Sequence, residues 1–211
     1  YQFDGTKWTR HSYEFTAMSG TGPNDVWGSE GFGQTGFRKA GSQLRHWDGT
    51  SWTGVRPAPD AIFARAPNDV WTSFSGGSVS HFDGTTWTDI PCCGGTSIWG
   101  SSPTDVWFAG PKAVIHYDGT NWIDANLPVS NAPGATIWGT AANDVWLCSD
   151  NNGIRHFNGT SWTLVDTAPN CSDVVGLAPN DVVFAGTNKW WNGSSLQAIS
   201  PYVGAMRVRS G

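Results

Sequence analysis

One short phrase recurs along this 211-residue chain and constrains its fold more than any other feature. In this phrase an aromatic residue is followed by Asp-Gly-Thr or Asn-Gly-Thr and then, after one further residue, by Trp. The full copies are "FDGTKW" (3–8), "WDGTSW" (47–52), "FDGTTW" (82–87), "YDGTNW" (117–122) and "FNGTSW" (157–162), with a decayed copy, "WNGSSL", at 191–196. Because internal repeats place equivalent residues in equivalent structural units, the phrase predicts a repeat protein.

A second phrase alternates with the first. It reads "GPNDVW" (22–27), "APNDVW" (66–71), "SPTDVW" (102–107), "AANDVW" (141–146) and "APNDVV" (178–183). Its Asp recurs at positions 25, 69, 105, 144 and 181, a period of roughly 40 residues. A period of this size, made of strands and turns without helical patterning, is typical of the blades of a β-propeller.

Each repeat can be divided into four strands. In one unit these are "ATIWGT" (135–140), "VWLCS" (145–149), "GIRHF" (153–157) and "SWTLV" (161–165). Asn and Asp supply the turn between the first two strands, and Asn-Gly supplies a hairpin turn between the last two. We name these strands a, b, c and d in chain order.

The chain contains five complete units and two remainders. The units span 16–56, 61–91, 96–126, 135–166 and 172–199. Residues 1–10 match strands c and d, and residues 201–211 align with strand a, since Val203-Gly204 falls where Trp99-Gly100 stands. We therefore predict one all-β domain over 1–211, a propeller of six blades closed by both ends of the chain. Five blades are the alternative. A closed ring leaves no exposed sheet edge.

The paired phrases resemble the repeat of many secreted bacterial β-propeller proteins, and they are similar to those of Asp-box and WD-repeat propellers. The resemblance covers nearly the whole chain. The Asp box has one residue between its Asp and Gly, and here the two are adjacent, which argues against the sialidase group. The resemblance implies the fold, whereas function depends on the particular site that a fold carries.

Four His residues occupy one repeated position: His46, His81, His116 and His156. An aliphatic residue two positions earlier puts each His on a packed strand face. We predict that each His bonds to the Asp of its own "NDVW" phrase, because buried polar groups need partners. This reading gives the series a structural role, and we expect no metal site.

The chain is rich in tryptophan, with 14 Trp, and nine of them are the last residue of a copy of one of the two repeated phrases. A residue required in every unit favours packing between blades. Trp99 and Trp138 instead share a position that varies, being Ser19, Phe63, Val175 and Val203 elsewhere. These two and Trp190 are therefore our candidate ligand-binding tryptophans.

The loops predict which face carries a site. The a–b and c–d turns hardly change and share one face of the disc, whereas the variable loops 28–43, 89–97 and 124–135 lie on the other. Variable loops on a rigid scaffold are the usual seat of function. Cys92 and Cys93 lie on this face, as a predicted vicinal disulfide that offers a ligand an apolar plate, or alternatively as two half-buried thiols. A second disulfide is predicted between Cys148 and Cys171.

Composition narrows the partners and the location. The formal net charge is −5 and no basic run occurs, so nucleic acid is not an expected partner. The chain contains no stretch of 18 consecutive apolar residues, so the sequence predicts no membrane-spanning helix. Four Cys with few charged residues favour a secreted or cell-surface protein. Because the chain begins at Tyr1, we expect a processed protein or a piece of a longer one.

The sequence favours a binding protein over an enzyme. Glycoside hydrolysis normally needs two neighbouring carboxylates, and the only Glu residues are Glu14 and Glu30. No nucleotide, metalloprotease or serine-hydrolase motif occurs, and we expect no cofactor. We predict a non-catalytic, lectin-like propeller that binds a glycan or glycoconjugate. The alternative is a protein-interaction scaffold, or a surface module of a longer secreted protein, with a protein partner.

Overall fold

The computed structural model describes residues 2–3, 6–9, 13–31, 40–127, 135–150, 153–167 and 169–199. Within them every regular element is a β-strand, and the strands form five antiparallel four-stranded sheets and one two-stranded sheet. This part of the chain contains no helix long and apolar enough to cross a lipid bilayer.

Each four-stranded sheet keeps its strands in chain order. The first contains β3 (Phe15–Gly22), β4 (Asp25–Glu30), β5 (Gln43–Trp47) and β6 (Trp52–Pro57). The second contains β7 (Ala61–Ala66), β8 (Asp69–Phe74), β9 (Ser78–Phe82) and β10 (Trp87–Ile90), and the third contains β11 (Ser97–Ser102), β12 (Asp105–Ala109), β13 (Val114–Tyr117) and β14 (Trp122–Asp124). The fourth contains β15 (Ala135–Ala141), β16 (Asp144–Ser149), β17 (Gly153–Phe157) and β18 (Trp162–Asp166), and the fifth contains β19 (Asp173–Ala178), β20 (Asp181–Ala185), β21 (Lys189–Trp191) and β22 (Leu196–Ala198).

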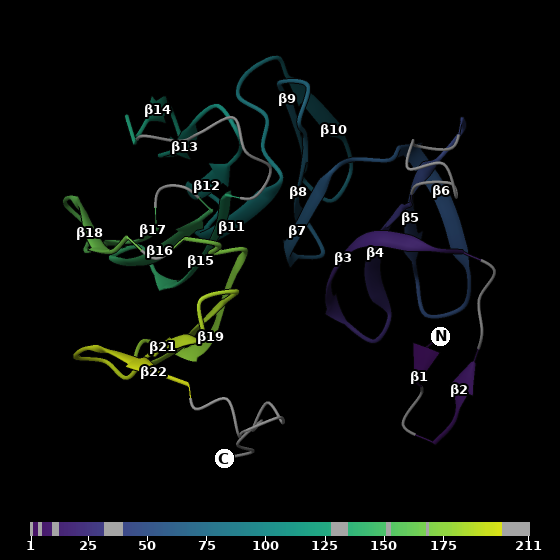
Figure 1. Cartoon of the computed structure of the whole chain (residues 1–211). Coiled ribbons are helices and arrows are strands. Elements are labelled where there is room, and N and C mark those ends of the chain that lie inside the picture. Colours follow the sequence, from purple (N-terminus) through teal and green to yellow (C-terminus); the bar gives the residue numbers. More distant parts are fainter. Residues whose placement is uncertain are drawn as a thin grey trace.

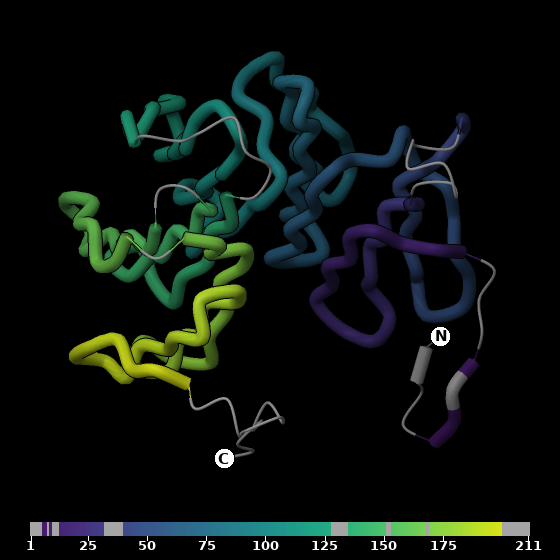
Figure 2. The backbone as a smooth tube through the Cα atoms, in the orientation of Figure 1, coloured from purple at the N-terminus to yellow at the C-terminus, as the bar shows by residue number. Residues whose placement is uncertain are grey.

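The sheets stand around a central space in chain order, with β3, β7, β11, β15 and β19 innermost (Figures 1 and 2). Each of these inner strands contacts the next one along the series. The fold is therefore that of a β-propeller, as the repeat predicts. The five predicted units agree with the five sheets to within two residues at each end.

The predicted blade count is met only in part. The described residues form five complete sheets, not six, and β1 (Gln2–Phe3) pairs with β2 (Trp8–Thr9) in a sheet of two strands. Figure 1 places β1 and β2 on one side of the opening in the ring and β19–β22 on the other. The predicted closing strand at 201–211 lies outside the described residues, so closure stays a prediction.

An Asp–His pair recurs in each of the first four sheets. His Nε2 lies 2.7 Å from Asp Oδ1 in His46–Asp25, 2.7 Å in His81–Asp69, 2.6 Å in His116–Asp105 and 2.7 Å in His156–Asp144. Each His ring also stacks on the Trp of its "DVW" phrase, with ring centroids 4.0–4.2 Å apart. The predicted bond of each His to the Asp of its own repeat phrase is confirmed. In the fifth sheet Trp190 and Val183 occupy the corresponding places.

Tryptophan rings join one sheet to the next. The Trp of strand b packs against the Trp of strand d in the following sheet, at 5.7 Å for Trp27–Trp87 and 5.3 Å for Trp107–Trp162. The strand-b rings are almost fully buried. Because a buried aromatic ring contributes a few kcal/mol, this repeated contact accounts for the Trp of the repeat phrases.

The Asp-Gly-Thr turns are held by their own side chains. Asp48 Oδ1 accepts the backbone N–H groups of Thr50 and Ser51 at 2.8 and 2.9 Å, and Asn158 Oδ1 accepts the corresponding pair at 3.0 Å each. The turn glycines have φ near +95°, where side chains are strained. A Cβ at Gly49 would lie 2.6 Å from Asn24, and each other c–d turn is equally close to its a–b turn. Both turns therefore share one face, as predicted.

These turns predict an acid-sensitive stability. Hydrogen bonds from the Thr50 hydroxyl and from the backbone of Ser51 and Thr50 lower the pKa of Asp48 from 3.8 to about 2. The pKa values of Asp83 and Asp118 are lowered in the same way. A lowered pKa stabilises the fold above the unfolded-state value, and that stability is lost as pH falls through the folded-state value. We expect the melting temperature to fall between pH 4 and pH 2.

The matched variant replaces the three carboxylates by amides. Asn158 and Asn192 make the same turn bonds without a charge, so Asp48→Asn, Asp83→Asn and Asp118→Asn together should preserve the fold. Melting temperatures followed by circular dichroism should fall less steeply with acid in this variant than in the wild type. Parallel acid profiles would contradict the assignment.

Candidate functional site

A groove between the third and fourth sheets is the strongest candidate for a binding site among the described residues. Its volume is about 380 Å³, within the range of small-molecule and side-chain pockets. The lining is mainly aromatic and aliphatic and includes two hydroxyls; its members are Trp107, His116, Ile123, Ala125, Leu127, Phe157, Thr160, Ser161 and Trp162.

The third sheet supplies one wall through its last two strands and the residues that follow them. β14 ends at Asp124, and the chain leaves the sheet through Ala125, whose N–H still bonds to Val114 O at 2.9 Å. Ile123 lies opposite His116 in the β13–β14 register and is 45% exposed. Thr53, Thr88 and Thr163 are exposed at the same place in three other sheets, so the third sheet differs by carrying an apolar side chain there.

The fourth sheet supplies the other wall through its c–d hairpin. Phe157 and Trp162 flank the turn, and their rings lie 5.1 and 5.3 Å from the Trp107 ring. Thr160 and Ser161 belong to the turn itself and also line the groove. The aromatic contact that joins two sheets therefore also forms the floor of the groove.

The one titratable ring in the groove already has a partner. His116 Nε2 lies 2.6 Å from Asp105 Oδ1, below the Trp107 ring. Burial acts to raise the pKa of Asp105, but the hydrogen bonds from His116 and Ser101 outweigh it and lower that pKa. Asp105 is therefore a carboxylate that holds His116 in place.

The tryptophans predicted to bind ligand lie elsewhere. Trp99 is 9% exposed on β11, and Trp138 on β15 packs against the same apolar cluster. Their rings lie over Gly139 and Gly176 of the following sheets. Trp190 is half-buried on β21, opposite Val183. None of the three lines the groove, and their role as ligand contacts stays a prediction.

Cys92 and Cys93 form the vicinal disulfide, and both are half-buried. Cys93 has a φ of +22° and packs against the apolar cluster shared by the second and third sheets. The following Gly94 lies so close to the end of β8 that a Cβ there would be 1.9 Å from Phe74 O. The loop is thus packed between two sheets, and ligand binding by this disulfide also stays a prediction.

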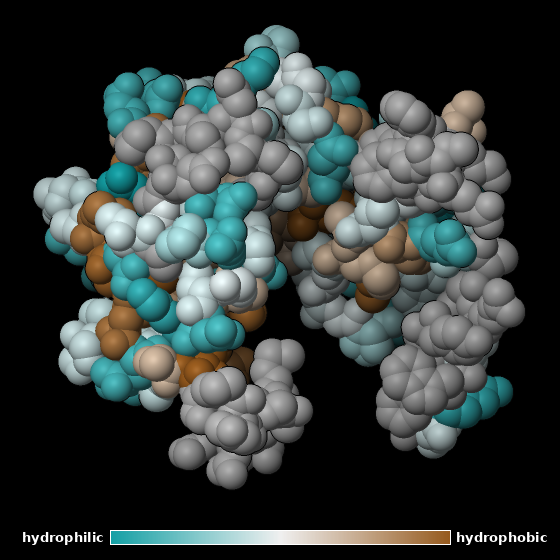
Figure 3. Space-filling model, viewed as in Figure 1, coloured by the Kyte–Doolittle hydropathy of each residue, from teal (hydrophilic) through white to brown (hydrophobic). Residues whose placement is uncertain are grey.

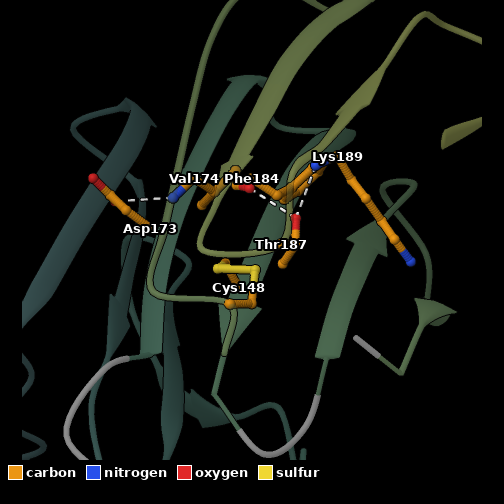
Figure 4. Close-up of a disulfide and its surroundings, with 7 residues drawn as sticks. Cys148, Asp173, Val174, Phe184, Thr187 and Lys189 are labelled. Carbon is orange, nitrogen blue, oxygen red and sulfur yellow. Dashed lines mark hydrogen bonds between the residues drawn. A yellow bond between two sulfur atoms is a disulfide. The ribbon is translucent and has the colours of Figure 1, made fainter. Parts of the chain in front are cut away.

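Cys148 and Cys171 form the second disulfide, between the fourth and fifth sheets, and both are fully buried. Figure 4 shows Cys148 beneath β19 and β20, near Val174 and Phe184. Nearby, the Thr187 hydroxyl donates to Phe184 O at 2.7 Å and accepts the Lys189 N–H at 3.2 Å. This bond fastens the last complete sheet to the rest of the ring.

The position of Cys148 carries Ser in the first two sheets. Ser29 Oγ donates to Pro59 O at 2.6 Å, and Ser73 Oγ donates to Gly95 O at 2.7 Å while accepting the Gly95 N–H at 2.6 Å. Pro59, Gly95 and Cys171 each stand two residues before an inner strand. The disulfide therefore replaces a hydrogen bond that ties one sheet to the next.

Among the residues that the structure describes, no group of three His, Cys, Asp or Glu side chains is arranged to hold a metal ion. Much of the predicted variable face lies outside them, since 32–39 belong to loop 28–43 and 128–134 belong to loop 124–135. Ala125 and Leu127 are the described residues of the second loop that reach the groove.

No protein-family model and no curated protein matches this chain. Several solved structures are similar to it. YCF48 bound to D1 peptide aligns with a TM-score of 0.59 and 17% identity, over 91% of this chain and 69% of that one. The computationally designed Ika8 protein aligns with a TM-score of 0.61 and 15% identity, over 88% of this chain and 60% of that one. The extracellular domain of the putative hybrid two component system BT4673 from B. thetaiotaomicron aligns with a TM-score of 0.62 and 11% identity, over 93% of this chain and 28% of that one. These similarities show the fold.

Proposed function

We propose that this protein is a non-catalytic protein-interaction scaffold that binds an apolar side chain of a partner polypeptide in the groove between the third and fourth sheets. The composition of the groove carries the proposal. Its described lining contains no carboxylate, amide or guanidinium side chain, and its His116 is occupied by Asp105. An apolar side chain would pack against apolar groups there, and Thr160 and Ser161 could form hydrogen bonds with the peptide backbone on either side of it.

A glycan, the ligand predicted from the sequence, has less support at this site. Sugar hydroxyls that lose water without gaining hydrogen bonds carry a large free-energy cost, and the groove offers two hydroxyls for them. YCF48, a structural neighbour, is bound to a peptide. That likeness concerns the fold, and it supports a peptide ligand only as a precedent for this kind of scaffold.

The disulfides support a location outside the reducing cytosol, and the contacts of Glu30 support a role without catalysis. Both pairs of cysteines are joined as disulfides, which persist in oxidising compartments. Glu30, one of the two glutamates, has both oxygens engaged, by the Arg45 guanidinium at 2.5 Å and by the Gln43 N–H at 2.7 Å. The scaffold that we propose is secreted or displayed at the cell surface, and it is closed as a ring with β1 and β2 in a sixth sheet.

The test is a selection from a random peptide library, run beside a glycan array on the same protein. We expect peptides with an aromatic or aliphatic anchor. Ile123→Asp should weaken their binding by at least about tenfold, because it places a carboxylate in an apolar contact centre. Leu164→Asp is the matched control, since Leu164 is 47% exposed on β18 and does not line the groove.

The control should bind as the wild type does. Equal loss in both variants would contradict a site in the groove. Specific binding on the glycan array without any selected peptide would favour carbohydrate binding over peptide binding.

A further inference from the structure

One residue near the end of each outermost strand points toward the following sheet. In the first four sheets this residue lies opposite a fully buried aliphatic residue; these partners are Leu44, Val79, Val114 and Ile154. The buried partners belong to the apolar clusters shared with the following sheet, and residues opposite one another in an antiparallel pair share a face. We call this place the bridging position; its residues are Arg56, Ile90, Ala125 and Asp166.

A second place faces the bridging position from the following sheet. It is taken by the residue that directly precedes the repeat His, or that precedes Trp190 in the fifth sheet. Arg155 lies opposite Leu147 and Lys189 lies opposite Phe184, and both of these partners are buried against the preceding sheet. We call this place the receiving position; its residues in the second to fifth sheets are Ser80, Ile115, Arg155 and Lys189.

Charged groups are paired at two of the junctions. Between the fourth and fifth sheets the Lys189 ammonium donates to the Asp166 carboxylate, directly from the receiving to the bridging position. Between the first and second sheets the Arg56 guanidinium donates to Asp89 Oδ1 at 2.5 Å, and the same oxygen accepts the Ser80 hydroxyl at 2.6 Å. A charge at either position therefore meets an opposite charge from the neighbouring sheet.

The junction that contains the groove has no such match. Between the second and third sheets Ile90 and Ile115 both pack against one apolar cluster, so that junction is apolar on both sides. Between the third and fourth sheets Arg155 stands at the receiving position and Ala125 at the bridging position. Ala125 carries no charge and is too short to reach across. Its small side chain lines the groove.

Arg155 is a charge without a partner in the part of the chain that the structure describes. It is half-buried, and its Nε is buried and makes no hydrogen bond. The other described arginines form ion pairs, Arg45 with Glu30, Arg56 with Asp89 and Arg65 with Asp69. A guanidinium that has lost part of its hydration gains a charge-assisted hydrogen bond when a carboxylate approaches it.

We propose that the partner polypeptide carries an Asp or Glu side chain beside its apolar anchor, and that this carboxylate pairs with Arg155. The carboxylate takes the place beyond Ala125 that the Asp166 carboxylate takes at the next junction. This pairing rests on the proposed function, because the anchor that fills the groove brings the carboxylate to Arg155.

The spacing of the two contacts suits an extended peptide. Arg155 stands two residues from Phe157, a lining residue of the groove, on the same face of β17. Two residues of a strand span about 7 Å, so the anchor and the acidic residue should be one or two residues apart. Figure 3 shows hydrophilic and hydrophobic residues side by side over the fourth sheet, at the left of the view.

The experiment compares a selected peptide with its amide version, in which Asp is replaced by Asn or Glu by Gln. Both peptides are amidated at the C-terminus, so only the side chain supplies a carboxylate. The wild type should bind the acidic peptide at least about tenfold more tightly, as expected for a close charge pair across an interface. Arg155→Met should bind both peptides equally. Lys112→Met removes the same charge from an exposed site between β12 and β13, and it should keep the wild-type difference.

The outcomes separate this pairing from the groove itself. Equal binding of the two peptides by the wild type, an unchanged difference in Arg155→Met, or selected peptides without an acidic residue near the anchor would overturn the pairing and leave the apolar groove. Peptides that bind only with a free C-terminal carboxylate would overturn the side-chain pair. If no peptide is selected, or if Ile123→Asp binds as the wild type does, the proposed function fails and the pairing fails with it.

A second measurement needs no partner. Ala125→Asp places a carboxylate at the bridging position, as in the Asp166–Lys189 pair, and Ala125→Asn is the uncharged control. Ala125→Asp should have the higher melting temperature of the two, and the difference should vanish in the Arg155→Met background, because the coupling of two groups disappears when either is removed. Equal melting temperatures with Arg155 present would put its guanidinium out of reach and overturn the proposal.

Discussion

The double variant Cys148→Ala, Cys171→Ala should be less stable than the wild type by about 3 kcal/mol, the value that the loop-entropy model gives for a loop of this length. The two cysteines are 23 residues apart in sequence and tie the fourth sheet to the fifth. Both are fully buried in the cluster around Trp146, Val174 and Phe184. The free energy of unfolding in guanidinium chloride, measured without reductant, provides the comparison.

The molecule supplies a natural control for this variant. Cys148→Ser, Cys171→Gly reproduces the Ser73–Gly95 pair, which joins the second and third sheets by two hydrogen bonds. This control should recover roughly 1 kcal/mol, the net value of a typical buried hydrogen bond. If the alanine variant is as stable as the wild type, the disulfide does not fasten the fifth sheet as we describe.

His81→Ala should lower the free energy of unfolding by about 1–3 kcal/mol, because it leaves a buried carboxylate short of a hydrogen bond. Asp69 is 3% exposed and accepts from His81 at 2.7 Å. Burial acts to raise the pKa of Asp69, but the hydrogen bonds from His81 and Arg65 outweigh it and lower that pKa. The substitution also removes the ring stacked on Trp71 at 4.0 Å.

His81→Gln is the control, since its amide can still donate to Asp69, and thermal or chemical unfolding should place it between the alanine variant and the wild type. Unchanged stability in His81→Ala would contradict a stabilising role for the Asp–His pair. The fifth sheet, with Trp190 in place of the His, shows that a sheet forms without this pair. The pair is therefore a stabilising contact and not a requirement of the fold.

The repeated units could be predicted from the sequence because each unit carries its own turns, and the first four also carry an Asp–His pair. The sequence predicts the strand "GIRHF" at 153–157, and β17 spans Gly153–Phe157. The constant lengths of the a–b and c–d turns predict that both lie on one face, and Gly49 lies against Asn24. Local signals of this kind need no knowledge of the neighbouring sheet.

The groove could not be predicted in the same way. One of its walls continues beyond β14 into Ala125 and Leu127, and the repeat phrases do not extend to these residues. Its walls come from Ile123 and Phe157, on different sheets. The sequence offers one signal for the groove: Ile123 follows the repeat Trp where the other full copies of the phrase have Thr.

The variable tryptophans have a second explanation that the sequence does not reveal. Trp99 and Trp138 occupy a position that varies, and this variation predicts ligand contact. The structure supplies a packing reason: the residue is large where the facing residue is Gly139 or Gly176, and it is Ser19 where the facing residue is Ala64. Only the pairing of strands from consecutive sheets makes that match visible.

Hydrogen exchange of the protein with the tightest peptide from the library selection tests the central claim most directly. Bound peptide should slow exchange in 122–127 and 157–162, the two walls of the groove, because amides covered by a ligand are protected. The Ile123→Asp variant should show no such protection at the same peptide concentration. Protection confined to the loop at 89–97, with both walls unchanged, would contradict a binding site in the groove.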